Sequence, residues 1–264
     1  MMVSKDESKK KTRIKSLFLS DIHLGFRGCQ AESLLDLMKS YDYDNLFLIG
    51  DIIDLWAMKS KMFFPVSHSN VIRHILKQAK KDDVRVIFIP GNHDELFRDY
   101  CGETLAGVEI HEEFLYESVS GKRLLLLHGD KFDLITMNNK WIALFGSWLY
   151  DISLSISNKI SYIRRKLGAR RHWSFSRFMK HRVKKAVQYI DNFSDAVVKE
   201  ATNRSVEGII AGHIHHPEIT LLPSGVLYMN CGDFVESCSA IIELTEGSFQ
   251  LISFPFLKGC PSKQ

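Results

Sequence analysis

The chain has 264 residues, of which 45% are hydrophobic and 25% are charged, as expected for a globular protein with one large domain or a core plus an insert. Its five cysteines are scattered and form no C-x-x-C pair, which argues against a zinc ribbon or a disulfide framework and favours a reducing compartment. No apolar run approaches the ~18 residues that span a bilayer, and the polar, basic start lacks the apolar region of a signal peptide, so we expect a cytoplasmic protein.

Five short apolar runs predict buried strands, because each is bounded by turn-forming residues. They occupy residues 15–20, 45–50, 84–90, 123–129 and 207–213. Apolar residues at helical spacing predict helices over 31–41 and 69–81. Strand and helix alternate, so we expect an α/β fold with a largely parallel sheet covered by helices. After residue 215, short β runs broken by Pro and Gly predict antiparallel strands at the edge of a second sheet.

A long helical pattern interrupts the strands from residue 137 to 203. Residues 141–163 offer a broad apolar surface, and residues 173–190 have the pattern of a basic amphipathic helix. From Ile152 to Ile190 the chain carries eleven Lys/Arg and no Asp or Glu, which leaves 24 Lys/Arg against 31 Asp/Glu elsewhere. The net charge of +4 therefore conceals one concentrated positive segment on an otherwise acidic protein.

Each of the five predicted strands ends in residues that bind metals. In strand order they are Asp21 and His23, then Asp51, then Asn92 and His93, then His128, and finally His213 and His215. Because the carboxyl ends of parallel strands meet at one edge of a sheet, we expect these side chains to converge there. A single such strand end would be unremarkable, but five in succession indicate a site.

The spacing of the paired residues has a physical reason. Side chains alternate across an extended chain, so the two members of D-x-H and of H-x-H project to the same side. Carboxylate, amide oxygen and imidazole, without thiolate, suit Mn²⁺, Fe²⁺ or Zn²⁺ better than a sulfur-bound structural zinc. Seven such residues exceed the needs of one ion and can serve two.

The motifs together resemble those of the calcineurin-like metallophosphoesterase superfamily. D-x-H, G-D-x-x-D, G-N-H-D, an isolated His and G-H-x-H occur in this order between about Lys15 and Pro217. The resemblance implies an α/β fold, a sandwich of two mixed sheets flanked by helices, in a domain over residues 13–258 that binds two divalent ions, with Mn²⁺ expected and Fe²⁺ or Zn²⁺ as alternatives. It implies one ion on Asp21, His23 and His215, and another on Asn92, His128 and His213. Asp51 would bridge the two ions.

The same resemblance implies a mechanism. Two cations ~3.5–4 Å apart stabilise a shared hydroxide, which attacks phosphorus in line with the leaving group. Asn92 and His93 would contact the phosphate, and a protonated His93 would donate to the leaving oxygen. Asp94 would orient His93. We take Asp54 and Asp130 as helix caps or as supports of the ligands, and His68, His74, His111, His172 and His181 as surface or boundary residues.

Within the superfamily, SDIHLG, GDIIDLW, HGD, GHIHHP and the helical insert are similar to the UDP-2,3-diacylglucosamine diphosphatases of lipid A biosynthesis. This similarity implies hydrolysis of the acylated UDP-sugar to UMP and 2,3-diacylglucosamine 1-phosphate. Those enzymes usually carry Arg where this chain has His93. It further implies a peripheral protein at the inner face of the inner membrane of a Gram-negative-type bacterium.

The insert over residues 137–200 is expected to form a lid. Its apolar side would accept acyl chains, and its basic side, with Lys184 and Lys185, would contact phosphate or an anionic membrane surface. A plain helical core and a solvated basic face are the alternative interpretations of these patterns. No protein partner is predicted.

Three other functions remain open at this stage. A phosphodiesterase or nucleotidase with a soluble substrate would use the same site, although the apolar load of the insert argues against it. A non-catalytic binding module on the same scaffold should lack ligands, whereas Asp51 and the others are present. A nuclease would grip nucleic acid with the basic insert, but the many aliphatic residues there make nucleic acid an unlikely partner.

Overall fold

The computed structural model describes residues 11–133 and 192–254. Two compact units divide the chain, one of residues 1–130 and 197–264, the other of residues 131–196. In the smaller unit, the rings of Phe132 and Phe193 meet edge-on with centroids 5.2 Å apart. The expected lid, with its apolar and basic segments and with Lys184 and Lys185, lies outside the described residues except for its last part, where residues 192–204 are helical.

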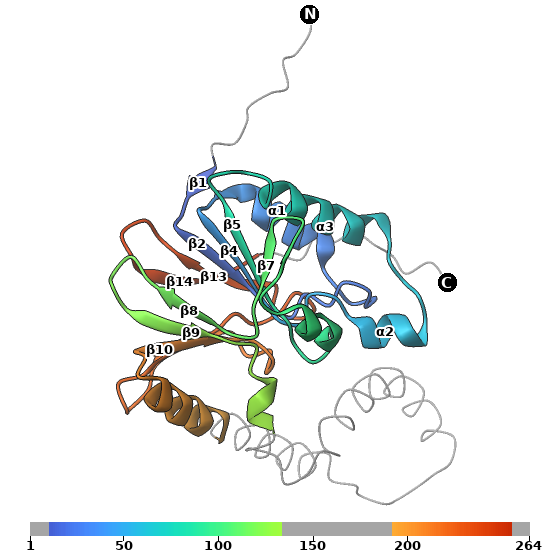
Figure 1. Ribbon diagram of the computed structural model, residues 1–264. Helices are drawn as coiled ribbons and strands as arrows, with labels where there is room; N and C mark the ends of the chain where they lie inside the picture. Colours follow the sequence, from blue (N-terminus) through green and yellow to red (C-terminus); the bar gives the residue numbers. More distant parts are fainter. Residues whose placement is uncertain (1–10, 134–191, 255–264) are drawn as a thin grey trace, which may run out of the picture. The chain divides into compact units, whose positions relative to one another are not determined.

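The larger unit is built on two mixed sheets (Figure 1). The first has the strand order β14 (Phe249–Ser253), β13 (Ser239–Glu243), β2 (Ser16–Leu19), β4 (Asn45–Ile49), β5 (Arg85–Ile89), β7 (Val108–Ile110) and β6 (Thr104–Leu105). The second has the order β11 (Glu218–Leu221), β12 (Leu227–Asn230), β10 (Gly208–Ala211), β9 (Arg123–Leu126) and β8 (Phe114–Glu117). A separate short pair joins β1 (Thr12–Arg13) to β3 (Tyr41–Asp42).

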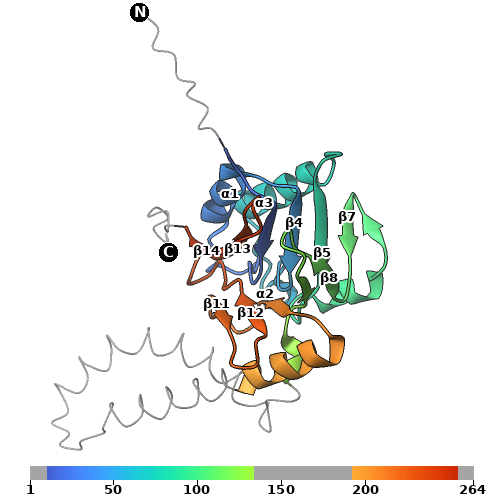
Figure 2. The same cartoon turned by 90° about the vertical axis from the view of Figure 1, so that its left-hand side faces the viewer.

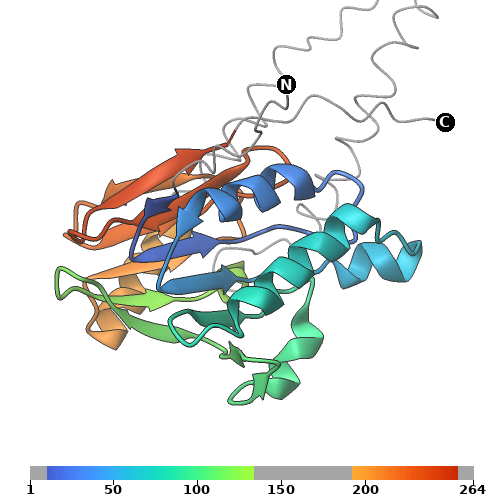
Figure 3. The same cartoon turned by 90° about the horizontal axis from the view of Figure 1, so that it is seen from above.

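Helices cover one face of the first sheet. Besides the helical residues 192–204, the described helices are α1 (Ala31–Ser40), α2 (Leu55–Ser60) and α3 (Val66–Gln78), with 3₁₀ turns η1 (Glu95–Tyr100) and η2 (Asp130–Phe132). Seen from above, α1 and α3 lie over this sheet on the side away from the second sheet (Figure 3). The expected α/β architecture of two mixed sheets flanked by helices is therefore confirmed. No helix in the described part of the chain combines the length and apolar character that crossing a bilayer requires.

The core has two layers. Leu17, Leu19 and Leu48 face α1 and α3 in one buried cluster. The alternate residues Phe18 and Phe47 point the other way, stack with centroids 4.8 Å apart, and pack with residues of the second sheet such as Met229. Strands buried on both faces need apolar residues at every position, which explains why the five runs were recognisable in the sequence.

The direction of the strands places the site. β2, β4, β5 and β7 run parallel in the first sheet, and β9, β10 and β12 run parallel in the second. The carboxyl ends within each sheet therefore meet at one edge. The sequence did not reveal β7 and β8, because these strands are short and contain charged or exposed residues. Pairing with neighbouring strands near the sheet margins stabilises them.

Candidate metal centre

Three sets of ligand-type side chains come together at the carboxyl edge of the strands. They are Asp21, His23 and His215; Asp21, Asp51 and His128; and His23, Asp54 and His93. Within each set, the atoms that could bind a metal all lie within 4.8 Å of one another. The structure thus brings together residues from five separate strand ends, and the chain has a dinuclear His/Asp site.

The distances give the order of the ligands around the site. His215 Nε2 lies 3.2 Å from Asp21 Oδ1, and His128 Nε2 lies 3.5 Å from Asp51 Oδ2. The same Asp51 oxygen is 3.9 Å from His23 Nε2. Asp51 therefore faces one histidine of each half, as a shared ligand must.

The two remaining expected ligands lie on the His128 side. Asn92 Oδ1 is 3.3 Å from His128 Nε2, and the ring centroid of His213 is 5.1 Å from that of His128. The amide of His213 donates to Asp21 Oδ2 over 2.9 Å. All seven expected metal ligands are therefore neighbours in the fold.

The backbone at this edge is strained. Asp21, His23, Asp51, His213 and His215 all have φ between 50° and 70°, in the left-handed region that non-glycine residues rarely adopt. Such conformations cost on the order of 1–3 kcal/mol each and cluster at functional sites. At Gly50 and Gly91, an added Cβ would run into His128 and Asp51 respectively. The ligands can approach one another only because the chain has no side chain at these two positions.

Unsatisfied atoms show that the residues fit a bound cation. Among the described residues, His23 Nε2 is buried without a hydrogen-bond partner, although its other nitrogen is bonded. Leaving a buried polar atom unpaired is costly. A divalent ion at this position would satisfy the nitrogen and the surrounding carboxylates together, and the mixed oxygen and imidazole donors suit such an ion.

The charges of the site are strongly coupled without metal. Burial alone would lower the pKa of His128, but the carboxylates of Asp51 and Asp21 raise it to about 10. Burial would also lower the pKa of His215, but the carboxylate of Asp21 raises it to about 9. The carboxyls of Asp21 and Asp51 respond in the opposite sense: burial would raise their pKa values, but the neighbouring histidines hold them well below the usual range. Protons on His128 and His215 therefore balance the buried carboxylates of the metal-free protein.

Metal affinity is expected to rise steeply with pH. A metal must displace the protons of His128 and His215, whose pKa values are above neutrality. For each proton displaced, the apparent affinity should rise about tenfold per pH unit until the pH passes the pKa of the group. Titration calorimetry with Mn²⁺ in buffers of different ionisation enthalpy measures the protons released. An affinity that does not change between mildly acidic and mildly alkaline pH would contradict this charge state.

Asp54 supports two histidines at once. Its Oδ2 lies 3.1 Å from His23 Nδ1, and its Oδ1 lies 3.0 Å from His93 Nδ1. Asp54 also caps α2, since Oδ1 accepts the amide of Ala57 over 2.7 Å. One carboxylate thus fixes the ring orientation of a metal ligand and of the expected phosphate contact. This confirms the expectation that Asp54 is a cap and a support.

Asp94 has a different partner from the expected one. Its carboxylate is fully buried and accepts the backbone amides of Gly91 (2.6 Å) and Ile52 (2.7 Å), with longer bonds to the amides of residues 51 and 53. It therefore ties the turn after β5 to the turn after β4. The side chain that holds His93 is Asp54, so the expectation that Asp94 orients His93 was wrong.

Replacing Asp54 by Asn should lower kcat about 10- to 100-fold, the usual cost of removing a carboxylate behind a ligating histidine. The amide can still hydrogen-bond, but it does not stabilise a positive imidazole. Steady-state kinetics and metal analysis should show lower kcat together with weaker metal retention, because His23 is affected as well as His93. Asp83→Asn, at an exposed position on the other edge of the sheet, is the matched control. Unchanged kcat in the Asp54 variant would show that the two bonds are not functional.

His93 is a partly exposed residue of the site. Its side chain is 25% exposed, its Nε2 lies 3.9 Å from Asp51 Oδ2, and its amide donates to Asp51 Oδ1 over 2.8 Å. The ring of Trp56 lies against it, with centroids 4.3 Å apart. Burial would lower the pKa of His93, but the hydrogen bond to Asp54 and the charges of Asp51 and Asp54 raise it. Asp54 thus holds the imidazole through Nδ1, and Nε2 faces Asp51.

Sequence reasoning missed three residues around the site. Asp233 Oδ2 lies 3.7 Å from His215 Nδ1 and follows β12, whose apolar run and Gly232–Asp233 turn were a usable signal. Trp56 had no periodic signal at all. His68 was expected at the surface or its boundary but is buried, and its Nδ1 accepts the amide of Gly25 over 2.9 Å. No spacing in the sequence links residues 43 apart.

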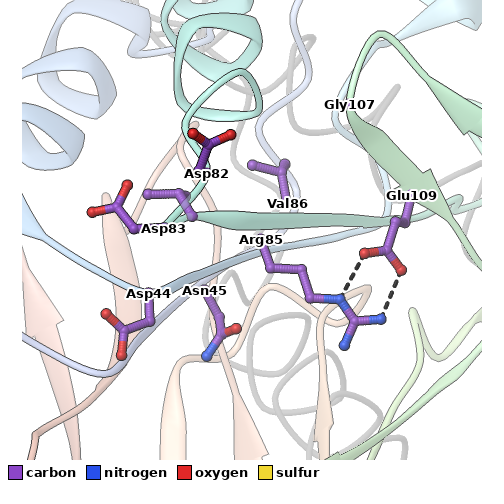
Figure 4. Close-up of a pocket in the computed structure, with 9 residues that line it drawn as sticks. Asp44, Asn45, Asp82, Asp83, Arg85, Val86, Gly107 and Glu109 are labelled. Atoms are coloured by element: carbon purple, nitrogen blue, oxygen red, sulfur yellow. Dashed lines mark hydrogen bonds and ion pairs between the residues drawn. The ribbon is translucent and has the colours of Figure 1, made fainter.

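A surface hollow lies elsewhere, at the amino ends of β4 and β5 (Figure 4). Asp44, Asp82 and Asp83 line it, and Arg85 forms a two-pronged ion pair with Glu109 at 2.6 and 2.7 Å. The strands begin here and end at the metal centre, so the hollow is on the opposite edge of the sheet. The residues that line the hollow include no histidine, and the hollow lies away from the metal centre.

Comparisons with known proteins agree with this geometry. A sequence profile described as calcineurin-like phosphoesterase matches residues 14–217. A UDP-2,3-diacylglucosamine hydrolase of Shewanella pealeana is 27% identical over 257 residues, covering 93% of this chain and 100% of the relative. One from Psychromonas ingrahamii is 25% identical, covering 76% of this chain and 81% of the relative.

Solved structures are more distant. An archaeal phosphodiesterase is 15% identical with a TM-score of 0.43, covering 90% of this chain and 99% of that one. A hypothetical protein of Pyrococcus horikoshii is 11% identical with a TM-score of 0.48, covering 94% and 90%.

Proposed function

This chain belongs to the calcineurin-like phosphoesterase family and is a metal-dependent phosphoesterase, and from that premise we propose that it hydrolyses the pyrophosphate bond of UDP-2,3-diacylglucosamine. The products are UMP and 2,3-diacylglucosamine 1-phosphate. The observation that carries the proposal is the extent of the similarity: a relative named for this reaction aligns over its whole length and over 93% of this chain. The alternative of a non-catalytic scaffold loses its support, because the ligand-type side chains converge instead of being scattered.

The proposed ligand sets follow the strand ends. Asp21, His23 and His215 hold one ion, and Asn92, His128 and His213 hold the other. Asp51 bridges them, in keeping with its position between His23 and His128. Mn²⁺ is the proposed metal, with Fe²⁺ and Zn²⁺ as the alternatives that the same donors accept. When bound, the two ions supply a hydroxide at neutral pH and offset the charge of the phosphate oxygens.

His93 is proposed as the general acid. With Nδ1 held by Asp54 and the imidazolium form favoured by the adjacent carboxylates, Nε2 carries a proton into the site, where Asp51 Oδ2 lies 3.9 Å away. Donation to the leaving oxygen as the P–O bond breaks avoids expelling a full negative charge. Asn92, the preceding residue, is proposed to contact the phosphate. The remaining proposed contacts, Lys184 and Lys185, belong to the insert.

A mass-spectrometric assay separates the proposed substrate from the alternatives. The full chain is incubated with Mn²⁺ and UDP-2,3-diacylglucosamine, and in parallel with an unacylated UDP-sugar and with bis-p-nitrophenyl phosphate. We expect UMP and the acylated sugar phosphate, with much slower turnover of the unacylated sugar. Turnover of the aryl ester and the unacylated sugar without hydrolysis of the glycolipid would overturn the lipid substrate but keep the phosphoesterase.

A soluble nucleotide or phosphodiester is the second candidate, and one observation favours it. The enzymes that the motifs resemble usually carry Arg at the position of His93. An imidazole cannot form the two parallel hydrogen bonds with which a guanidinium binds a phosphate. This site therefore differs from those enzymes at one phosphate contact. The assay above decides between the two candidates.

A further inference from the structure

Exposed apolar side chains lie at the sheet edge that carries the metal centre. They are Phe26 (37% exposed), Trp56 (46%), Met62 (73%) and Val66 (70%). Phe26 lies in the loop after β2, Trp56 on α2, and the other two between α2 and the start of α3, the part of Figures 1 and 2 next to the label α2. A helix that follows a parallel strand begins at the carboxyl edge of the sheet. All four residues therefore lie at the same edge as the metal ligands.

Internal contacts fix these segments to one another. An added Cβ at Gly25 would lie 2.6 Å from the side chain of Met58, so the loop packs tightly on α2. The amide of Gly25 bonds to His68 on α3. The guanidinium of Arg27 lies 4.4 Å from the centre of the Phe63 ring. The apolar side chains are therefore presented by one supported surface, which we name the α2 surface.

The charge on the α2 surface has one sign. Arg27, Lys59 and Lys61 are exposed, and no residue in the described part of the chain forms an ion pair with them. Residues 22–31 and 55–81 contain no Asp or Glu at all. Exposed aromatic and aliphatic groups interleaved with Lys and Arg match an anionic bilayer, where the apolar groups enter the boundary region and the cations meet lipid phosphates. An acidic protein surface would match the cations but not the apolar side chains.

We propose that the α2 surface docks the protein onto an anionic membrane, with the metal centre facing the headgroups. Trp56 joins the two sites, because it belongs to this surface and its ring contacts His93. A substrate with two acyl chains could then offer its pyrophosphate without leaving the bilayer. The inference deepens the proposed function, but the surface uses none of the expected metal ligands and none of the insert.

Vesicle sedimentation with the full chain tests the proposal. The vesicles are phosphatidylcholine with or without phosphatidylglycerol, and they contain no substrate, so the result does not depend on the identity of the substrate. The double variant K59Q/K61Q should bind the anionic vesicles about thirtyfold more weakly than wild type, from the contribution of each cation near such a surface. M62E/V66E should bind them at least about tenfold more weakly, since charge replaces apolar contact.

The control is L105E/L221E. Leu105 and Leu221 are 60% and 69% exposed, and they pair with the first residues of β7 and β12, at the edge opposite the site. This variant should bind vesicles as wild type does, and all three variants should hydrolyse bis-p-nitrophenyl phosphate normally, which shows that they fold. Wild-type vesicle binding by both α2-surface variants would overturn the proposal. An equal loss in the control variant would overturn it as well, because the binding would then not be confined to this surface.

Discussion

Replacing Asp51 with Asn should lower kcat at least about a thousandfold on any phosphodiester substrate. The proposed role of Asp51 is to hold both ions, and the charge stabilisation that bound metals give a phosphoryl transition state is worth several kcal/mol, with each 1.36 kcal/mol giving a factor of ten. The amide keeps the size of the side chain but removes the negative charge that faces His23 and His128. The rate with Mn²⁺ and the metal content by mass spectrometry should fall together.

Asp36→Asn is the matched control for this prediction. Asp36 is exposed on α1, so the same chemical change there should leave both rate and metal content unchanged. The Asp51 variant should be less stable than wild type in the metal-free state, because the carboxylate of Asp51 balances the proton on His128, so its folding is checked by circular dichroism at the assay temperature. Full activity with normal metal content in the Asp51 variant would contradict a shared ligand at this position.

Replacing His93 with Gln should produce a loss that depends on the leaving group. General acid catalysis contributes about 10²–10⁴-fold, but only where the leaving oxygen needs a proton. For a substrate that expels an alkoxide, such as a dialkyl phosphodiester, kcat should fall at least about a hundredfold. For bis-p-nitrophenyl phosphate, whose leaving group is a stable anion, the loss should be much smaller.

Comparing kcat across a series of leaving groups measures this difference. A steeper dependence on leaving-group pKa in the variant than in wild type supports proton donation, whereas an equal loss on every substrate would assign His93 to phosphate binding alone. His74→Gln is the control, because His74 lies on α3 and bonds to Gln78 away from the metal centre. It should leave both the rates and their dependence on leaving group unchanged.

The sequence alone determined the main sheet and the seven residues that gather at its edge. Buried strands need continuous apolar runs, so β2, β4, β5, β9 and β10 were visible without any structure. The direction of β2, β4 and β5 follows from the helices between them, and it sends Asp21 and Asp51 to one edge. β9 and β10 belong to the second sheet, so the placing of His128 beside Asp51 depends on how the two sheets pack. These inferences depend on local periodicity and on the rule that connects parallel strands, and both can be read along the chain.

Only the tertiary structure decided which side chains support those seven. Asp94 is next to His93 in the chain, yet its carboxylate turns to the amides of Gly91 and Ile52, while Asp54, 39 residues away, bonds the His93 ring. His68 on α3 meets Gly25 in the same way. Such contacts depend on how loops cross after the helices have packed on the sheet. The sequence around a short polar residue does not indicate its hydrogen-bond partner. Packing between distant segments determines that partner, and the neighbours in the chain do not.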